Sequence, residues 1–244
     1  MENIFNRKII FSRKQRINFN NSLYLKIEEI IIDELSDYFF IFGKSDKVKN
    51  MLLLNSENDN FNYEIFNNVK INKFAFLEND LENIELLNNF KKTDLIVGIN
   101  SLHNVNYLED YFSAIKNCLN DGGAFCGNFF GNGNLFELKK IIIQNDADFS
   151  PKVYPRFNPT ISAESIVNIL QKFNFQNITI SSEKINFEFC FYEALVFLKE
   201  INERNYFSQM QKYSPSRKIF TQNIPEKFTL DFDIIKFYCT KLYV

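Results

Sequence analysis

The hydrophobic pattern in the middle of the chain predicts alternating strands and helices. Residues 94–99 form a continuous apolar and largely β-branched run, as expected for a strand buried on both faces of a parallel sheet. The apolar residues of 108–119 then repeat at helical spacing, and 124–130 indicates another strand. A further helical pattern covers 135–144, with Asn134 as a candidate N-cap. This order predicts right-handed βαβ units in a parallel α/β sheet.

The flanking regions predict further elements of both kinds. Residues 22–40 have the apolar spacing of one long amphipathic helix, and Ser162 is a candidate N-cap for a helix that ends near Phe173. Short apolar runs predict strands at 51–54, 69–77, 177–182, 184–189 and 228–243, with a helix at 191–201. The segment 147–159 is rich in proline and lacks periodicity, so we expect it to run over the surface.

Together these elements predict one domain with a Rossmann-like α/β fold. The expected sheet is mostly parallel, with an antiparallel addition at its C-terminal edge. We expect an N-terminal helical extension at 1–45, a core βαβ part at 46–146, and a C-terminal part with a substrate-side insertion at 147–244. A chain of 244 residues with 45% hydrophobic residues can bury one core of this size.

Composition excludes several classes of function. A net charge of -2 argues against a dedicated nucleic-acid-binding protein, which would carry a basic excess. The single histidine, His103, and 4 cysteines without a CxxC pair predict no zinc or iron–sulfur site. No stretch is apolar for the roughly 18 residues that span a bilayer, and the first residues lack the apolar core of a signal peptide. We therefore expect a cytoplasmic protein without a transmembrane segment or a metal.

The distribution of the 7 glycines is informative. Nucleotide-binding loops need glycines close together, because the ligand approaches the backbone closely. All glycines except Gly43 lie between Gly98 and Gly133, so the loop after the first core strand has none. The segment 131–134 (GNGN) precedes a predicted helix and is a candidate anion cradle, with a simple turn as the alternative.

Four stretches of the sequence carry a family resemblance. They are Phe5-Asn6-Arg7, Asp94-Leu95-Ile96-Val97 with Ser101-Leu102-His103-Asn104-Val105-Asn106, Leu119-Asn120-Asp121-Gly122-Gly123, and Leu135-Phe136-Glu137-Leu138 with Ser150-Pro151-Lys152-Val153. Together they resemble the class I S-adenosylmethionine-dependent methyltransferases. The similarity is closest to the branch with the biotin-pathway methyltransferases and the methyltransferase-like assembly factors of respiratory complex I. The resemblance implies the class I methyltransferase fold, S-adenosylmethionine as cofactor, and a small-molecule or protein substrate, including a respiratory-complex subunit.

The resemblance also places the cofactor at the carboxyl ends of the parallel strands. The residues implied to bind it are Leu54, Asn55, Ser56, Glu57, Asp80, Leu81, Asn100, Ser101 and His103. Methyl transfer needs little acid–base help when the reacting groups are held in line, so no catalytic residue is predicted. Structural roles stay open: His103 as a loop side chain bonded to backbone, and Asp80 as a turn cap. For Asn100 and Ser101 the alternative is polar capping of a strand end.

The first half of the chain departs from the family pattern. The loop at 55–59 has side chains where the family has glycines, and Glu57 would bring a negative charge near the carboxylate of the cofactor. Only 39 residues separate Leu54 from Asp94. Two βα units need roughly 50 to 60 residues, which indicates a shortened or lost crossover helix. Two functions follow: a methyltransferase-like protein with weakened or lost cofactor binding, or a non-catalytic scaffold that assists complex I assembly or subunit modification.

Overall fold

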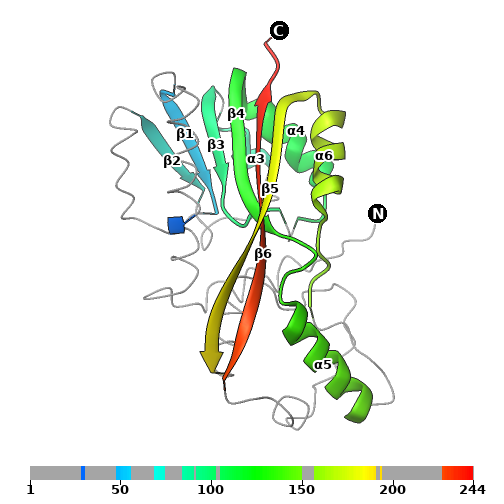
Figure 1. The fold of residues 1–244 in the computed structure, drawn as a ribbon. Coiled ribbons are helices and arrows are strands. Elements are labelled where there is room, and N and C mark those ends of the chain that lie inside the picture. The colour runs from blue at the N-terminus through cyan, green and yellow to red at the C-terminus, as the bar shows by residue number, and fades with distance from the viewer. Residues whose placement is uncertain are drawn as a thin grey trace.

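The fold is built on one six-stranded sheet with strand order β2-β1-β3-β4-β6-β5 (Figure 1). The computed structural model describes residues 29–30, 48–55, 69–74, 84–90, 92–102, 105–149, 157–190, 193 and 227–243. The strands are β1 (Asn50–Leu54), β2 (Lys70–Phe74), β3 (Thr93–Gly98), β4 (Leu119–Phe130), β5 (Phe175–Cys190) and β6 (Lys227–Lys241). The helices are α3 (Ile84–Leu87), α4 (Leu108–Cys118), α5 (Phe136–Phe149) and α6 (Ala163–Lys172).

Strand directions confirm the predicted Rossmann-like α/β fold. The pairs β1–β2, β1–β3 and β3–β4 are parallel, whereas β6 runs antiparallel to both β4 and β5. The antiparallel strand therefore lies one position inside the edge, between β4 and the edge strand β5. The predicted N-terminal helix at 22–40 lies outside the described residues, apart from 29–30, so this part of the fold stays a prediction.

The core lies between the sheet and the helices α3, α4 and α6. In Figure 1, α4 lies behind the sheet and α6 lies beside β5. Phe112 of α4 packs edge-on against Phe125 of β4, with ring centroids 5.9 Å apart. Phe125 in turn contacts Phe237 of β6 at 4.9 Å. Edge-to-face pairs of this kind add to the stabilisation from buried apolar area. They fasten the antiparallel addition to the parallel part of the sheet.

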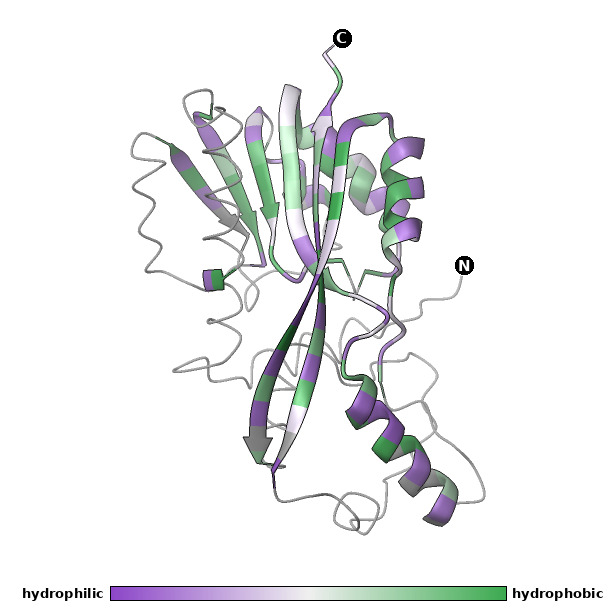
Figure 2. Ribbon diagram, in the orientation of Figure 1, coloured by the Kyte–Doolittle hydropathy of each residue, from purple (hydrophilic) through white to green (hydrophobic). Residues whose placement is uncertain are grey.

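The strands β5 and β6 continue beyond the parallel sheet as a two-stranded arm (Figure 1). Along this arm hydrophobic and hydrophilic residues alternate (Figure 2), as expected when one face packs and the other meets water. Leu230 and Phe232 are buried, while Asp231 and Asp233 are only half-buried. This alternation is that of a strand with one buried and one half-exposed face.

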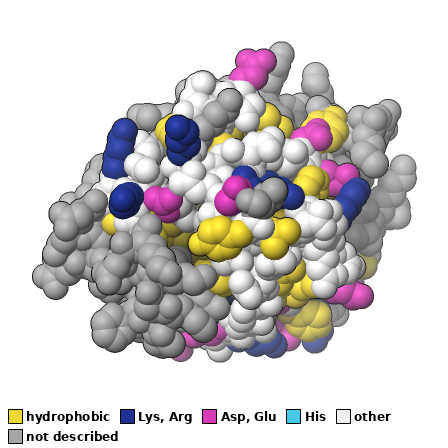
Figure 3. Space-filling view, turned by 90° about the horizontal axis from the view of Figure 1, so that it is seen from above, with side chains coloured by type: hydrophobic (Ala, Val, Ile, Leu, Met, Phe, Trp, Pro, Cys, Tyr) yellow, Lys and Arg dark blue, Asp and Glu magenta, His cyan; other side chains and the backbone are white. Residues whose placement is uncertain are grey.

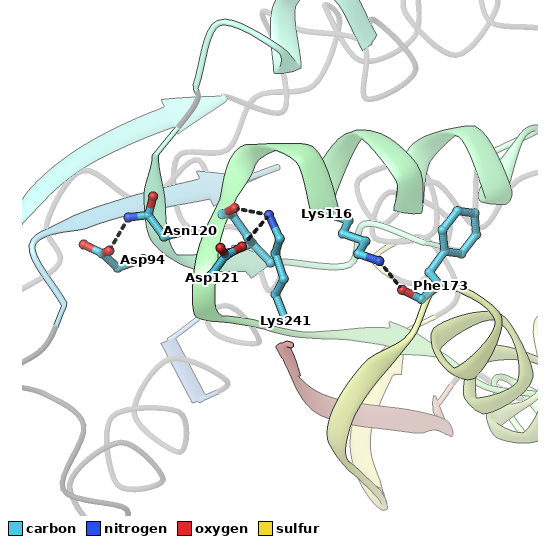
Figure 4. A network of polar contacts seen from close by, with 7 residues as sticks. Asp94, Lys116, Asn120, Asp121, Phe173 and Lys241 are labelled. Atoms are coloured by element: carbon cyan, nitrogen blue, oxygen red, sulfur yellow. Dashed lines mark hydrogen bonds and ion pairs between the residues drawn. The ribbon is translucent and has the colours of Figure 1, made fainter. Parts of the chain in front are cut away.

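Side-chain hydrogen bonds close the end of the sheet where the parallel strands begin (Figure 4). Asp94 Oδ2 accepts the backbone N–H groups of Lys49 and Asn50, each at 2.9 Å, and its Oδ1 accepts Asn120 Nδ2 at 2.6 Å. Lys241 Nζ donates to the carbonyl of Leu119 at 2.8 Å. These contacts join β1, β3, β4 and β6. Seen from this end, lysine and acidic side chains lie around a hydrophobic patch (Figure 3).

Several predicted boundaries are corrected. Helix α5 continues to Phe149, so residues 147–149 are helical and not part of the expected surface excursion. The segments 177–182 and 184–189 belong to one strand, because β6 pairs with it continuously from Thr179 to Cys190. Residues 121–123 form an irregularity within β4, where Gly122 adopts φ +73°. Asn134 does not cap α5, which begins at Phe136.

Other predicted elements are confirmed or lie outside the described residues. Ser162 caps α6 as predicted, since its Oγ accepts the N–H of Ser165 at 3.1 Å. The only helix described between β2 and β3 is the four-residue α3. Residues 56–68 and 75–83 fall outside the described ranges, so the shortened crossover stays a prediction. The helix predicted at 191–201 is described only at residue 193.

Candidate functional site

The candidate site lies where β1, β3 and β4 end, on the edge opposite the Asp94 contacts. Parallel pairing aligns Leu54 of β1 with Gly98 of β3, so the segments that follow emerge side by side. This brings together four of the predicted cofactor-binding residues: Leu54, Asn55, Asn100 and Ser101. The other five, namely Ser56, Glu57, Asp80, Leu81 and His103, lie outside the described residues. Their roles stay predictions.

Asn55 bridges the ends of β1 and β3. Its backbone adopts φ 66°, a left-handed conformation that glycine favours and asparagine tolerates better than most residues. Its Nδ2 donates to the carbonyl of Ile99 at 2.8 Å and to that of Asn100 at 3.3 Å. The N–H of Ile99 also donates to the carbonyl of Leu54 at 3.0 Å. The two chains therefore stay hydrogen-bonded beyond the last residue of each strand.

A second pair of contacts links β3 to β4. The N–H of Asn100 donates to Asn128 Oδ1 at 3.0 Å, and Asn128 Nδ2 donates back to Asn100 Oδ1. Asn55, Asn100 and Asn128 are 2%, 4% and 0% exposed, so these are buried hydrogen bonds. We call these three residues the asparagine bridge. It joins the carboxyl ends of all three strands.

Asn128 is the site residue that the sequence analysis missed. It stands within the buried run 124–130, where an amide is costly unless both of its polar atoms find partners. An asparagine within a buried apolar run is the feature of the sequence that could have identified this residue. Neighbouring Gly127 faces Gly98, and a Cβ added at Gly127 would collide with the backbone carbonyl of Gly98. The glycine therefore permits the close approach of β3 and β4 next to the bridge.

Ser101 and Tyr111 are buried beside the bridge, each 1% exposed. Burial raises the pKa of the Tyr111 phenol far above its ordinary value, while the Ser101 hydroxyl acts in the opposite direction. The phenol is therefore neutral at physiological pH and does not act as a base. Together with the three amides, it makes the described part of this edge polar but uncharged.

The GNGN segment after β4 is a turn fastened to β6, which overturns its interpretation as an anion cradle. The N–H of Gly131 donates to the carbonyl of Asp233 at 2.8 Å, and the N–H of Gly133 donates to Asp233 Oδ2 at 2.8 Å. The N–H of Asn134 donates to the carbonyl of Gly131 at 3.2 Å. An anion would thus find these amides occupied and a carboxylate beside them.

Neither the buried cysteines nor the other metal-ligating side chains form a reactive centre among the described residues. Burial raises the pKa of the Cys126 and Cys239 thiols, so both stay protonated and unreactive. Within the described ranges, no group of three His, Cys, Asp or Glu residues could hold a metal ion. None of the described helices is long and apolar enough to cross a membrane.

Comparison with curated proteins finds one relative, which is named as a methyltransferase. No protein-family model matches the chain. The chain is similar to a Rickettsia prowazekii (strain Madrid E) protein named as a methyltransferase, with 29% identity over 110 residues. The match covers 44% of this chain and 48% of that protein. The chain thus spans about half the length of the curated relative that it matches.

The chain is also similar to solved methyltransferase structures at low identity. A Bacillus halodurans protein described as a methyltransferase has 10% identity and a TM-score of 0.43, over 82% of this chain and 86% of that one. An Archaeoglobus fulgidus SAM-dependent methyltransferase has 12% identity and a TM-score of 0.41, over 90% and 100%. Haemonchus contortus phosphoethanolamine N-methyltransferase 2, bound to S-adenosylhomocysteine, has 14% identity and a TM-score of 0.40, over 80% of this chain and 49% of that one.

Proposed function

We propose that this chain is a methyltransferase-like protein of the cytoplasm whose binding of S-adenosylmethionine is weakened or lost. The Rickettsia prowazekii relative supports the methyltransferase class. The parallel strands that end together at one edge support a ligand site there. The observation that carries the loss is the side chain of Asn55, which is hydrogen-bonded across the ends of β1 and β3.

A cofactor at this edge would have to displace the asparagine bridge. Asn55 is 2% exposed, and its amide already uses the carbonyls of Ile99 and Asn100. Each buried hydrogen bond that is broken without replacement costs about 1–3 kcal/mol. We infer that the described residues do not fit S-adenosylmethionine between β1 and β3. No chemical step is therefore assigned to that cofactor.

Two forms of this function differ in what the fold does. If the bridge opens, the protein is an S-adenosylmethionine-dependent methyltransferase acting on a small molecule or a protein. If it stays closed, the protein is a non-catalytic scaffold, and the family resemblance favours a respiratory complex I subunit as its partner. The closed bridge favours the scaffold, because the hydrogen bonds of Asn55 and Asn128 already join the strand ends where a cofactor would lie.

Calorimetric titration with S-adenosylmethionine and S-adenosylhomocysteine tests the weakened cofactor site. We expect the wild-type protein to give no binding heat at millimolar ligand. The variant Asn55→Gly keeps the left-handed backbone and removes the bridging side chain, so it should gain measurable affinity. Asn174→Gly is the matched control, because Asn174 also has positive φ (56°) but lies in the turn after α6. Micromolar binding by the wild type would contradict the proposal.

Genetic complementation separates the scaffold from the enzyme. In the source organism, deletion of this chain should lower the amount of assembled complex I on native gels. A scaffold that needs no cofactor should be restored equally by the wild type and by Asn100→Asp, which places a negative charge in the buried bridge. A methyltransferase should be restored by the wild type alone. Circular dichroism of Asn100→Asp establishes that the variant is folded before the comparison is made.

A further inference from the structure

The turn after β4 and the part of β6 bonded to it hold a further group of buried polar atoms. Its backbone is fixed by β6: the N–H of Leu135 donates to the carbonyl of Asp231 at 2.7 Å, and Asp233 holds the N–H groups of Gly131 and Gly133. Asn134 therefore lies between the points where Asp231 and Asp233 bind the turn. The turn residues Gly131 to Leu135 follow the carboxyl end of β4, three or more positions after Asn128.

The side chain of Asn134 is buried without a hydrogen-bond partner. The residue is 0% exposed, and neither its Oδ1 nor its Nδ2 is bonded. Asp231 Oδ1 is likewise buried and unbonded. Nearly all buried side-chain polar atoms in native proteins have a partner, and each orphan costs about 1–3 kcal/mol. Two orphaned atoms of the turn and one of the adjoining strand β6 indicate a group that this part of the molecule receives.

The charges around the turn define the chemistry of that group. Asp231 and Asp233 are two positions apart on β6, so they share one face of the strand, and both are half-buried. The strand β5 places Asn186 opposite Asp231 and the exposed Lys184 opposite Asp233. Among the described residues, neither aspartate forms an ion pair. The two carboxylates thus belong to the residues that hold the turn of Asn134 in place.

We infer that Asn134 and Asp231 form a binding site for a ligand that carries a protonated amino group. Such a group donates several hydrogen bonds, which the orphaned Asp231 Oδ1 and Asn134 Oδ1 can accept. Asn134 Nδ2 is then free to donate to an acceptor on the same ligand. The inference rests on the proposed function in one respect: it makes an amine the substrate class of a methyltransferase-like protein. Binding itself needs no cofactor.

Nuclear magnetic resonance titration with n-butylamine tests this site directly. The side-chain amide signals of Asn134 should shift on addition of the amine at neutral pH, and n-butanol, its uncharged counterpart, should leave them in place. About 150 mM KCl in every sample screens loose ion pairing at the surface. Asp231→Asn should weaken binding at least tenfold while keeping the shape of the side chain. Asp148→Asn on α5 is the matched control, because Asp148 is exposed and remote from the turn.

Each outcome decides the question. Loss of the shifts in Asp231→Asn and in Asn134→Leu, but not in Asp148→Asn, supports the site. Equal shifts with butylamine and butanol would overturn it, and so would unchanged binding in Asp231→Asn. It would also be overturned if the Asn134 amide exchanged magnetisation only with a buried water. A misfolded Asn134→Leu variant leaves Asp231→Asn to decide. The amine titration is carried out without S-adenosylmethionine, so it can fail while the calorimetric test of the proposed function succeeds, and the reverse also holds.

Discussion

The two ends of the parallel sheet are both closed by side chains that reach from one strand to the next, but they differ in charge. At the amino end, the carboxylate of Asp94 accepts two backbone amides and one side-chain amide. At the carboxyl end, the neutral amides of the asparagine bridge bond to one another and to backbone carbonyls.

The ends also differ in how completely their polar groups are used. Both carboxylate oxygens of Asp94 have partners, and Lys241 forms an ion pair with Asp121 at 3.3 Å (Figure 4). At the carboxyl ends, Asn100 Nδ2 and Ser101 Oγ are buried without partners, and beyond them Asn134 and Asp231 also keep buried atoms without partners. A fully bonded network stabilises the fold, whereas unused buried groups favour a ligand. The comparison therefore assigns stability to the amino end and recognition to the carboxyl end.

The largest effect on stability is expected from breaking the buried bridge. Asn128→Ala removes both contacts with Asn100 and leaves a buried N–H and a buried carbonyl oxygen unpaired. We expect the free energy of unfolding to fall by about 3 kcal/mol. Urea denaturation measures it, with Asn186→Ala on the exposed side of β5 as a control expected to change stability by less than about 0.5 kcal/mol. Equal effects of the two substitutions would show that the bridge does not stabilise the fold.

A smaller loss is expected at the amino end, although a charge is removed there. Asp94→Ala frees the N–H groups of Lys49 and Asn50, which are exposed or half-buried and can bond to water. We expect a loss of about 1.5 kcal/mol in the same urea experiment. A larger loss for Asp94→Ala than for Asn128→Ala would show that burial does not decide which end of the sheet contributes more to stability.

The smallest effect at neutral pH is expected for Tyr111→Phe, which keeps the ring and removes the hydroxyl. Because the folded-state pKa of Tyr111 is raised, its contribution to stability is complete below the unfolded pKa of about 10 and is lost as pH rises above it. The stability of the wild type should thus fall more steeply than that of Tyr111→Phe between about pH 10 and 11. Parallel denaturation midpoints over that window would contradict the buried, neutral phenol.

Much of the fold could be predicted because its signals are local. The apolar runs of β1 and β3, the helical spacing of α4 and the cap at Ser162 each depend on a few neighbouring residues. The order of the chemistry-bearing segments also placed Asn55, Asn100 and Ser101 at one edge, since parallel strands end together. The boundaries of α5 and β5 were missed, because pairing and packing extended both elements beyond their local patterns.

The sequence by itself therefore determined a mostly parallel α/β sheet and a glycine-free loop after its first strand. Only the tertiary structure decided what takes the place of the missing glycines: Asn55 bonds to residues 44 and 45 positions away, and Asn100 pairs with Asn128 across 28. It also decided that Asp233 binds Gly133 across 100 positions, which turned a candidate anion cradle into a fixed turn. Periodicity reports which face of an element is buried, but a polar side chain acquires its partner only when the strands are brought together.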